Sequence, residues 1–332
     1  MGRGFLITHI EAALLVLLHS HASLALASET PFRRGLVPTS LGLVHYQMIG
    51  DIQTAAASRL LPIVGFHMSP RSVDEYKEVM ELSYQVDGNA RIFVAIDEFG
   101  YGQSDNPTQS CSIDQMADCF LQVLTRLGIQ RCIAAGSLMG CYIALSLAGR
   151  YPERIVGVVC SNLYYFQPAA REKAVCDARE NTSSSQDGRA IAVVDPWTLK
   201  DDGSHIGEIW DKRSSWLSPE LNTRATLDNL IYLVKRRERY AKGIYIPDGG
   251  AFPLPDACWQ SFCPVLCING AGAIEFFDKI GMDMTGQFQE AMTFFVSPPK
   301  QVVMEGSINM LNENPTEWLG HVVTLAKQIE GA

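Results

Sequence analysis

A tight turn between a predicted strand and a predicted helix is centred on residues 136–140, with the sequence GSLMG. The apolar run at residues 132–135 predicts a buried strand, and residues 141–147 predict the start of a buried helix. A sharp turn between two glycines is suited to presenting a nucleophile, because neighbours with a Cβ would collide with the strand or the helix. The central residue is Leu138, which has no nucleophilic group. The pattern therefore predicts the shape of a nucleophile site without its chemistry.

Three nearby side chains could supply the chemistry that the central leucine lacks. Ser137 precedes the turn centre, so we expect it to point away from the mouth of the site and to hydrogen-bond locally, with a nucleophile as the alternative. Cys141 opens the predicted helix, where a thiol can be activated, but no histidine is predicted beside it and core packing is favoured. His67 is expected to support its loop by hydrogen bonds, with a general base as the alternative.

Seven apolar runs recur along the chain with helical segments between them. They are residues 42–48, 61–66, 92–96, 132–135, 155–160, 265–268 and 301–304. From residue 61 onward the runs are nearly continuous rather than alternating, which is typical of parallel strands covered on both faces. Residues 72–75 (SVDE) and 112–115 (SIDQ) match the capping-box pattern that opens a helix. The predicted fold class is therefore α/β.

The alternation of strands and helices stops between residues 164 and 259, and this block is predicted to be a helical lid. Within it, residues 227–242 predict one helix. The charged run at residues 235–239 is expected to be a solvated face, with a basic ligand patch as the alternative. Three apolar residues of this helix are expected to face inward: Leu230, Ile231 and Val234.

Four local patterns between residues 41 and 318 resemble the α/β-hydrolase superfamily. Residues 66–70 (FHMSP) stand where that family has its H-G-x-P oxyanion loop, and residues 97–104 (DEFGYGQS) match its D-x-x-G-x-G-x-S loop. Residues 136–140 match its nucleophile elbow, and residues 150–155 (RYPERI) match its x-x-P-x-R-V link. The resemblance implies a mostly parallel central sheet flanked by helices, with a helical lid inserted.

The chain also resembles a subgroup of this superfamily with P-R-S after the third strand and D-G-S-H in the lid. Here these motifs are residues 70–72 and 202–205. In that subgroup the elbow centre is often not serine either, and its members are called hydrolases mainly by fold. This second resemblance therefore implies little about a substrate.

The resemblance implies that all three positions of a catalytic triad are vacated. Leu138 holds the nucleophile position, Ala273 the acid position, and Ile308, or Ser307 with a shift of one residue, the base position. None of these side chains can move a proton near neutral pH. Two acidic residues beyond the acid position could replace it only if that loop is rebuilt: Glu275 and Asp278.

The predicted ligand pocket is apolar because Met68 stands where the family has a glycine, and Leu138 and Met139 add apolar side chains. Its expected lining residues are His67, Met68, Ser69, Leu138 and Met139. No pattern calls for a cofactor. Cys258, Cys263 and Cys267 lack the spacing of a zinc site, so no metal is expected either.

The 332 residues, 47% of them hydrophobic, suit one large α/β domain with an insertion. The predicted division is a core at residues 28–163, a lid at 164–259 and the rest of the core at 260–332. The net charge of −9 argues against nucleic acid or an anionic membrane surface as the main partner.

Residues 1–27 predict a cleaved signal segment, with a short apolar run at residues 12–18 and the small residues of Ala25-Leu26-Ala27 before the cleavage point. The run is too short to span a bilayer, so the mature protein is not expected to be an integral membrane protein. We expect a secretory or extracellular destination, with an organelle reached through a presequence, or an uncleaved anchor, as the alternatives. Asn181 would then be a glycosylation candidate.

Two classes of function fit these observations. The first is a non-catalytic protein that binds a small apolar ligand or a protein partner. The alternative is a hydrolase or lyase-like enzyme that acts on a small ester, amide or carbon–carbon bond by a mechanism without the triad. The vacated positions favour the first, because fold alone is a poor guide to function and site residues are the stronger indication.

Overall fold

The computed structural model describes residues 32–51, 58–86, 91–165, 199–214, 217–247, 256–279 and 283–331, together with residues 172 and 176. The predicted signal segment at residues 1–27 and the sequon residue Asn181 lie outside this part of the chain. Within it, no helix combines the length and the apolar character that a membrane crossing requires. All nine cysteines belong to it, and all are free thiols.

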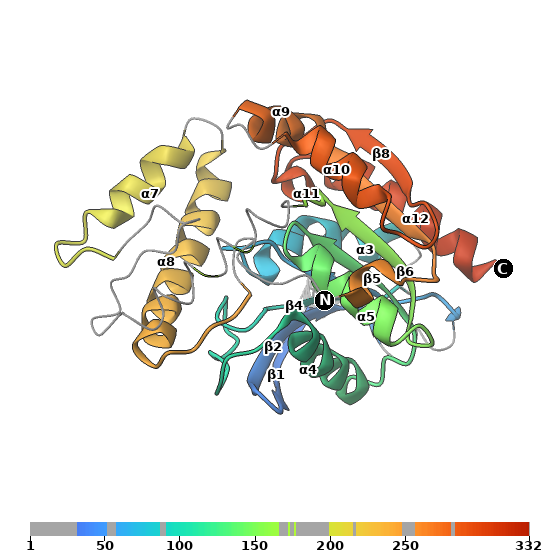
Figure 1. Cartoon of the computed structure of the whole chain (residues 1–332), viewed down its shortest axis with the longest axis horizontal. Helices are drawn as coiled ribbons and strands as arrows, with labels where there is room; N and C mark the ends of the chain where they lie inside the picture. The colour runs from blue at the N-terminus through green and yellow to red at the C-terminus, as the bar shows by residue number, and fades with distance from the viewer. Residues whose placement is uncertain are drawn as a thin grey trace, which may run out of the picture.

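In the part of the chain that the structure describes, eight strands form one sheet (Figure 1). The strands are β1 (Arg33–Thr39), β2 (Gly42–Ile49), β3 (Ile63–Phe66), β4 (Phe93–Ile96), β5 (Cys132–Ser137), β6 (Ile155–Ser161), β7 (Val265–Gly270) and β8 (Lys300–Met304). Their order is β1-β2-β4-β3-β5-β6-β7-β8; β2 is antiparallel to both neighbours, and the other pairs are parallel. The predicted mostly parallel sheet is confirmed. Only β1 was missed, because this edge strand begins with two arginines and contains a proline.

The helices cover both faces of the sheet. They are η1 (Val73–Tyr76), α3 (Lys77–Val86), α4 (Ile113–Arg126), α5 (Gly140–Arg150), α7 (His205–Ser214), α8 (Pro219–Ala241), η2 (Asp256–Trp259), α9 (Ala271–Lys279), α10 (Met284–Met292), α11 (Met310–Glu313) and α12 (Pro315–Glu330). α3 and α12 pack together over one face, and α4 and α5 pack over the other. Figure 1 shows α7 and α8, which belong to the block predicted as a lid, beside the sheet rather than over either face.

Alternating residues of the strands supply two separate cores. In β3, for example, Val64 and Phe66 join the core under α4 and α5, whereas Ile63 joins the core under α3 and α12. Side chains along a strand point to opposite faces, so a strand buried on both sides must be apolar throughout. The continuous apolar runs of the sequence follow from this arrangement.

The two predicted capping boxes differ. Ser112 and Gln115 form the reciprocal hydrogen bonds of a capping box at the start of α4, as predicted. Ser72 caps η1 by accepting the N–H of Asp74 at 3.2 Å, but Glu75 does not reach back to Ser72. Glu75 lies on the buried face of its helix and turns inward instead.

The prediction for the long helix of the insert was wrong about its buried face. Leu230 and Ile231 are only half-buried and Val234 is 47% exposed. Arg236 and Arg239, expected to be solvated, are buried because their guanidinium groups lie over the ring of Tyr232. The ring of Tyr232 also stacks on the ring of Tyr101, with the two ring centroids 5.0 Å apart. These two arginines, which have the spacing of an apolar stripe, therefore lie on the packed face of the helix.

Candidate functional site

The turn after β5 has the geometry of a nucleophile elbow. Leu138 adopts the left-handed conformation with φ of +46°, which is uncommon for a residue with a Cβ. A Cβ on Gly136 would lie 2.3 Å from the amide nitrogen of Cys141, and one on Gly140 would lie 2.1 Å from the carbonyl oxygen of Phe66. The glycines therefore permit the close approach of strand, turn and helix. Leu138 itself is half-exposed at the carboxyl edge of the sheet.

The two nucleophilic groups beside the elbow centre are both buried. Ser137 is fully buried in β5, with its hydroxyl next to the carboxyl group of Glu75. Cys141 is fully buried in α5, and its thiol donates to the carbonyl oxygen of Ser161 at 3.5 Å. Neither side chain is presented at the mouth of the turn.

Glu75 lies beneath the elbow as a fully buried carboxyl group. Its Oε2 accepts the backbone N–H of Met68 at 2.7 Å. Burial raises the pKa of Glu75, and Arg71, the Met68 N–H and the neighbouring Ser137 hydroxyl oppose that rise. Because Met68 donates to this carboxylate, its N–H is not available to stabilise an oxyanion.

Sequence reasoning missed Glu75 because the capping-box pattern assigned its carboxylate to the helix start. A different signal was present. Glu75 lies four residues before Val79 and five before Met80, and all three share the buried face with Tyr76. A carboxylate at the spacing of an apolar stripe indicates a buried group that needs a partner.

His67 uses both of its ring nitrogens within the protein. Nδ1 is 2.9 Å from the carbonyl oxygen of Met68, and Nε2 accepts the backbone N–H of Glu98 at 3.0 Å. These partners imply a neutral ring with the proton on Nδ1. Burial lowers the pKa of His67, outweighing the opposite effect of Asp97. The ring has no nitrogen left to take a proton from a substrate.

Asp97 anchors the neighbouring loop. Its carboxylate accepts the N–H groups of Val73 and Gln103, each at 2.7 Å, and lies 2.7 Å from Nδ1 of His45. Burial alone would raise the pKa of Asp97, but the hydrogen bond with His45 and the charge and backbone contacts around it lower that pKa. Asp97 is therefore an ionised structural group.

The positions that the resemblance assigns to the triad acid and base hold Ala273 and, after β8, Ser307 and Ile308. α9 begins directly after β7, so Ala273 is buried in a helix. Ser307 donates its hydroxyl to Oε1 of Glu313 at 2.6 Å, and its N–H donates to Oε2 at 2.6 Å. Ile308 is half-exposed beside it.

The two acidic residues that could have replaced the triad acid are engaged on α9. Glu275 pairs with Lys279 at 2.6 Å, and Asp278 accepts the N–H of Met284 at 2.7 Å. Both are exposed, unlike Ala273. The direct start of α9 has thus placed these carboxylates along a helix instead of in an acid loop.

Arg71, from the P-R-S motif, joins three segments at this edge. Its Nε donates to Asp228 of α8 at 2.9 Å, and its Nη1 donates to Asn309, next to the base position, at 3.2 Å. Ser72 donates to the same Asp228 at 2.6 Å. A second contact of α8 links Arg239 to the carbonyl oxygen of Gly100 at 3.4 Å. These contacts fix α8 above the loops that follow β3 and β4.

The predicted pocket residues are brought together but are not equally exposed. Ser69 and Leu138 are half-exposed, whereas His67, Met68 and Met139 are buried. No group of histidine, cysteine and acidic side chains that could hold a metal occurs among the residues that the structure describes.

Comparison with known proteins agrees with this geometry. A family model for the alpha/beta hydrolase fold matches residues 75–196. The enol-lactonase from Burkholderia xenovorans LB400 superposes with a TM-score of 0.60 at 17% identity, covering 88% of this chain and 100% of that chain. A malate-bound thermophilic esterase from Thermogutta terrifontis superposes with a TM-score of 0.63 at 15% identity, covering 90% and 99%. No curated protein sequence matches the chain.

These findings show that the chain has an α/β-hydrolase fold, and they confirm the fold predicted from the sequence. At such identities the structural similarity shows the fold and not the reaction. The function has to be argued from the residues of the site.

Proposed function

We propose that this chain is a non-catalytic member of the superfamily that binds a small apolar molecule between α8 and the elbow. The observation that carries the proposal is Leu138, an apolar side chain at the position that presents the nucleophile. The turn still has the geometry that presents a side chain to a ligand. What it presents can contribute dispersion and desolvation, about 25 cal/mol per Å² of apolar surface removed from water.

The surrounding polar groups support the same proposal. Acyl transfer needs a nucleophile, a base and donors for the oxyanion, and these act together. Ser137 is buried, both nitrogens of His67 are occupied, and the N–H of Met68 donates to Glu75. Arg71, the nearest buried cation, is already paired with Asp228. The site therefore offers little to a charged ligand and favours an apolar one.

The test is a thermal-shift screen of the purified protein with small apolar compounds. We expect some of them to raise the melting temperature of the wild type, and Leu138→Asp to lose these shifts, because a carboxylate at the floor of the site would have to be desolvated. Leu36→Asp is the matched control, since Leu36 is 53% exposed on the edge strand β1. Hits that all survive Leu138→Asp, or a wild type that no compound stabilises, would move a protein-partner role to the front.

A fluorophosphonate probe for serine hydrolases separates this proposal from the enzyme alternative. We expect no labelling of the wild type, because the elbow presents no hydroxyl. Stoichiometric labelling that disappears in Ser137→Ala would instead identify Ser137 as a nucleophile and reverse the ranking. An active esterase treated in parallel confirms that the probe reacts.

A further inference from the structure

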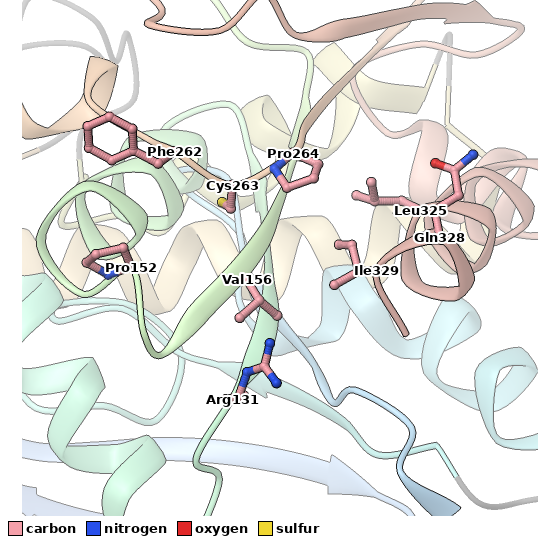
Figure 2. Close-up of a pocket in the computed structure, with 9 residues that line it drawn as sticks. All are labelled: Arg131, Pro152, Val156, Phe262, Cys263, Pro264, Leu325, Gln328 and Ile329. Atoms are coloured by element: carbon pink, nitrogen blue, oxygen red, sulfur yellow. The ribbon is translucent and has the colours of Figure 1, made fainter. Parts of the chain in front are cut away.

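A pocket lies at the opposite edge of the sheet from the elbow (Figure 2), with a volume of about 470 Å³. It opens where β5, β6 and β7 begin and where α12 ends. Val156, Pro264, Leu325 and Ile329 give it mainly apolar walls. Pockets of about 300–1,000 Å³ accommodate small organic ligands. This one is therefore large enough for a molecule of several carbon atoms.

Arg131 is the charged residue of the lining. Figure 2 shows its side chain pointing toward Val156. Among the described residues, no carboxylate forms an ion pair with Arg131, and no hydrogen bond of its guanidinium is formed. The nearby Arg154 differs, because its guanidinium donates to the carbonyl oxygens of Gln130 at 2.7 Å and Ile129 at 2.8 Å. Arg131 therefore keeps its donors for another group.

The rest of the lining is suited to an amphipathic molecule. Cys263 contributes a thiol whose pKa is raised by burial, so it brings no negative charge near Arg131. Gln328 adds a neutral amide that can donate a hydrogen bond. Phe262 stands at the pocket with 73% of its surface exposed, and a bound apolar chain would cover part of it. Large exposed aromatic side chains of this kind often mark contact sites.

We propose that this pocket binds a small amphipathic carboxylate, with its head group on Arg131 and its apolar tail against Val156, Pro264 and Ile329. A guanidinium binds a carboxylate through charge-assisted, commonly paired hydrogen bonds. A small hydrophilic anion would leave the apolar walls unused, and a neutral apolar molecule would leave Arg131 unused. The site is separate from the elbow and does not depend on the function proposed there.

The test is calorimetric titration with octanoate at low ionic strength. Because Arg131 is exposed and such ion pairs are worth about 0.2–1 kcal/mol, we expect wild-type binding to weaken up to about fivefold in Arg131→Gln. Hexanoate should bind up to about 15-fold more weakly than octanoate, since it lacks two methylenes and each one is worth about fourfold when buried. Arg126→Gln, an exposed arginine outside the lining, should bind octanoate like the wild type.

Two further variants locate the binding. Gln328→Trp places a large ring at an exposed position of α12 in the lining and should block octanoate, whereas Leu138→Asp alters only the elbow and should leave it unchanged. Octanol that binds as tightly as octanoate, or octanoate binding that survives both Arg131→Gln and Gln328→Trp, would overturn the proposal. Loss of octanoate binding in Leu138→Asp would assign the ligand to the elbow instead.

Discussion

Four loops lie on the same edge of the sheet, namely those after β3, β4, β7 and β8. The first two differ from the last two in the residues that stand at the positions of the superfamily motifs. On the first side, His67 and Asp97 stand at the positions of the superfamily motifs and are fully hydrogen-bonded to the loops around them. On the second side, Ala273 and Ile308 stand at the positions that the resemblance assigns to an acid and a base. Both sides belong to the same edge of one sheet, so the difference between them lies in what each residue does.

The two sides differ in what their motif residues do for the fold. Asp97 satisfies buried N–H groups of two separate segments, and an unmade hydrogen bond of this kind costs about 1–3 kcal/mol. The triad acid and base have no such duty toward the fold. Residues with structural tasks are therefore expected to resist substitution, and residues with only a chemical task are not.

The largest expected effect is that of Asp97→Ala. Three groups lose their acceptor at once, namely His45 and the N–H groups of Val73 and Gln103. We expect the free energy of unfolding to fall by about 4 kcal/mol. Urea denaturation measures it. Asp105→Ala is the matched control, because Asp105 is exposed and accepts a single N–H, from Leu43, and should cost about 1 kcal/mol or less.

The pH dependence of the same group sharpens this prediction. The pKa of Asp97 is lower in the folded protein than in the unfolded chain, so its contribution is complete above the ordinary aspartate pKa of about 3.9 and is lost as the pH falls through the folded value. Asp97→Asn should show a smaller loss of stability on acidification than the wild type. Equal acid sensitivity of the two proteins would mean that another group anchors the loop.

A smaller effect is expected at Glu75. Glu75→Ala leaves the N–H of Met68 without an acceptor and opens a cavity, so we expect unfolding to become easier by about 2–3 kcal/mol. Glu75→Gln retains an acceptor of the same shape and should stay within about 1 kcal/mol of the wild type. The pKa of Glu75 is raised in the folded state, so its carboxylate is least favourable at high pH.

Denaturation of these two variants between acidic and neutral pH checks the assignment. Relative to the wild type, Glu75→Gln should gain stability as the pH rises, because the amide has no proton to lose. If Glu75→Ala proved as stable as Glu75→Gln, the N–H of Met68 would not depend on this carboxylate. Of these three residues, only His67 and Asp97 would then hold the loops after β3 and β4 in place.

The smallest effect is expected on the other side of the edge. Ile308 is half-exposed at the base position, and Ile308→Ala should cost about 1 kcal/mol or less. Chemical denaturation beside Asp97→Ala makes the comparison direct. A cost above about 2 kcal/mol would show that the loop after β8 has a structural task of its own, which would break the contrast between the two sides.

Local patterns were sufficient to predict the sheet and the elbow. The apolar runs marked seven of eight strands because strands buried on both faces must be apolar throughout. The two glycines marked the elbow because their Cβ atoms would collide with backbone. In both cases the cause lies within a few residues of the signal, and a single sequence contains it.

The buried polar groups could not be placed in the same way, because their partners lie far along the chain. Arg71 and Asp228 are separated by 157 residues, and nothing in either neighbourhood indicates the other. Arg236 and Arg239 lie in a charged run that is typical of a solvated face, yet both contact the ring of Tyr232, and Arg239 also donates to the carbonyl oxygen of Gly100. Two charges that pair across a long stretch of sequence leave no periodic pattern near either residue.

The close packing of Gly140 against Phe66 has a consequence for how this motif evolves. A Cβ at this position would lie 2.1 Å from the carbonyl oxygen of Phe66, whatever residue stands at the centre of the turn. Selection for a stable fold alone is therefore enough to maintain this glycine, whether or not the turn takes part in a reaction. A pattern search that scores the glycines will label such chains enzymes, so the residue between them has to be read separately.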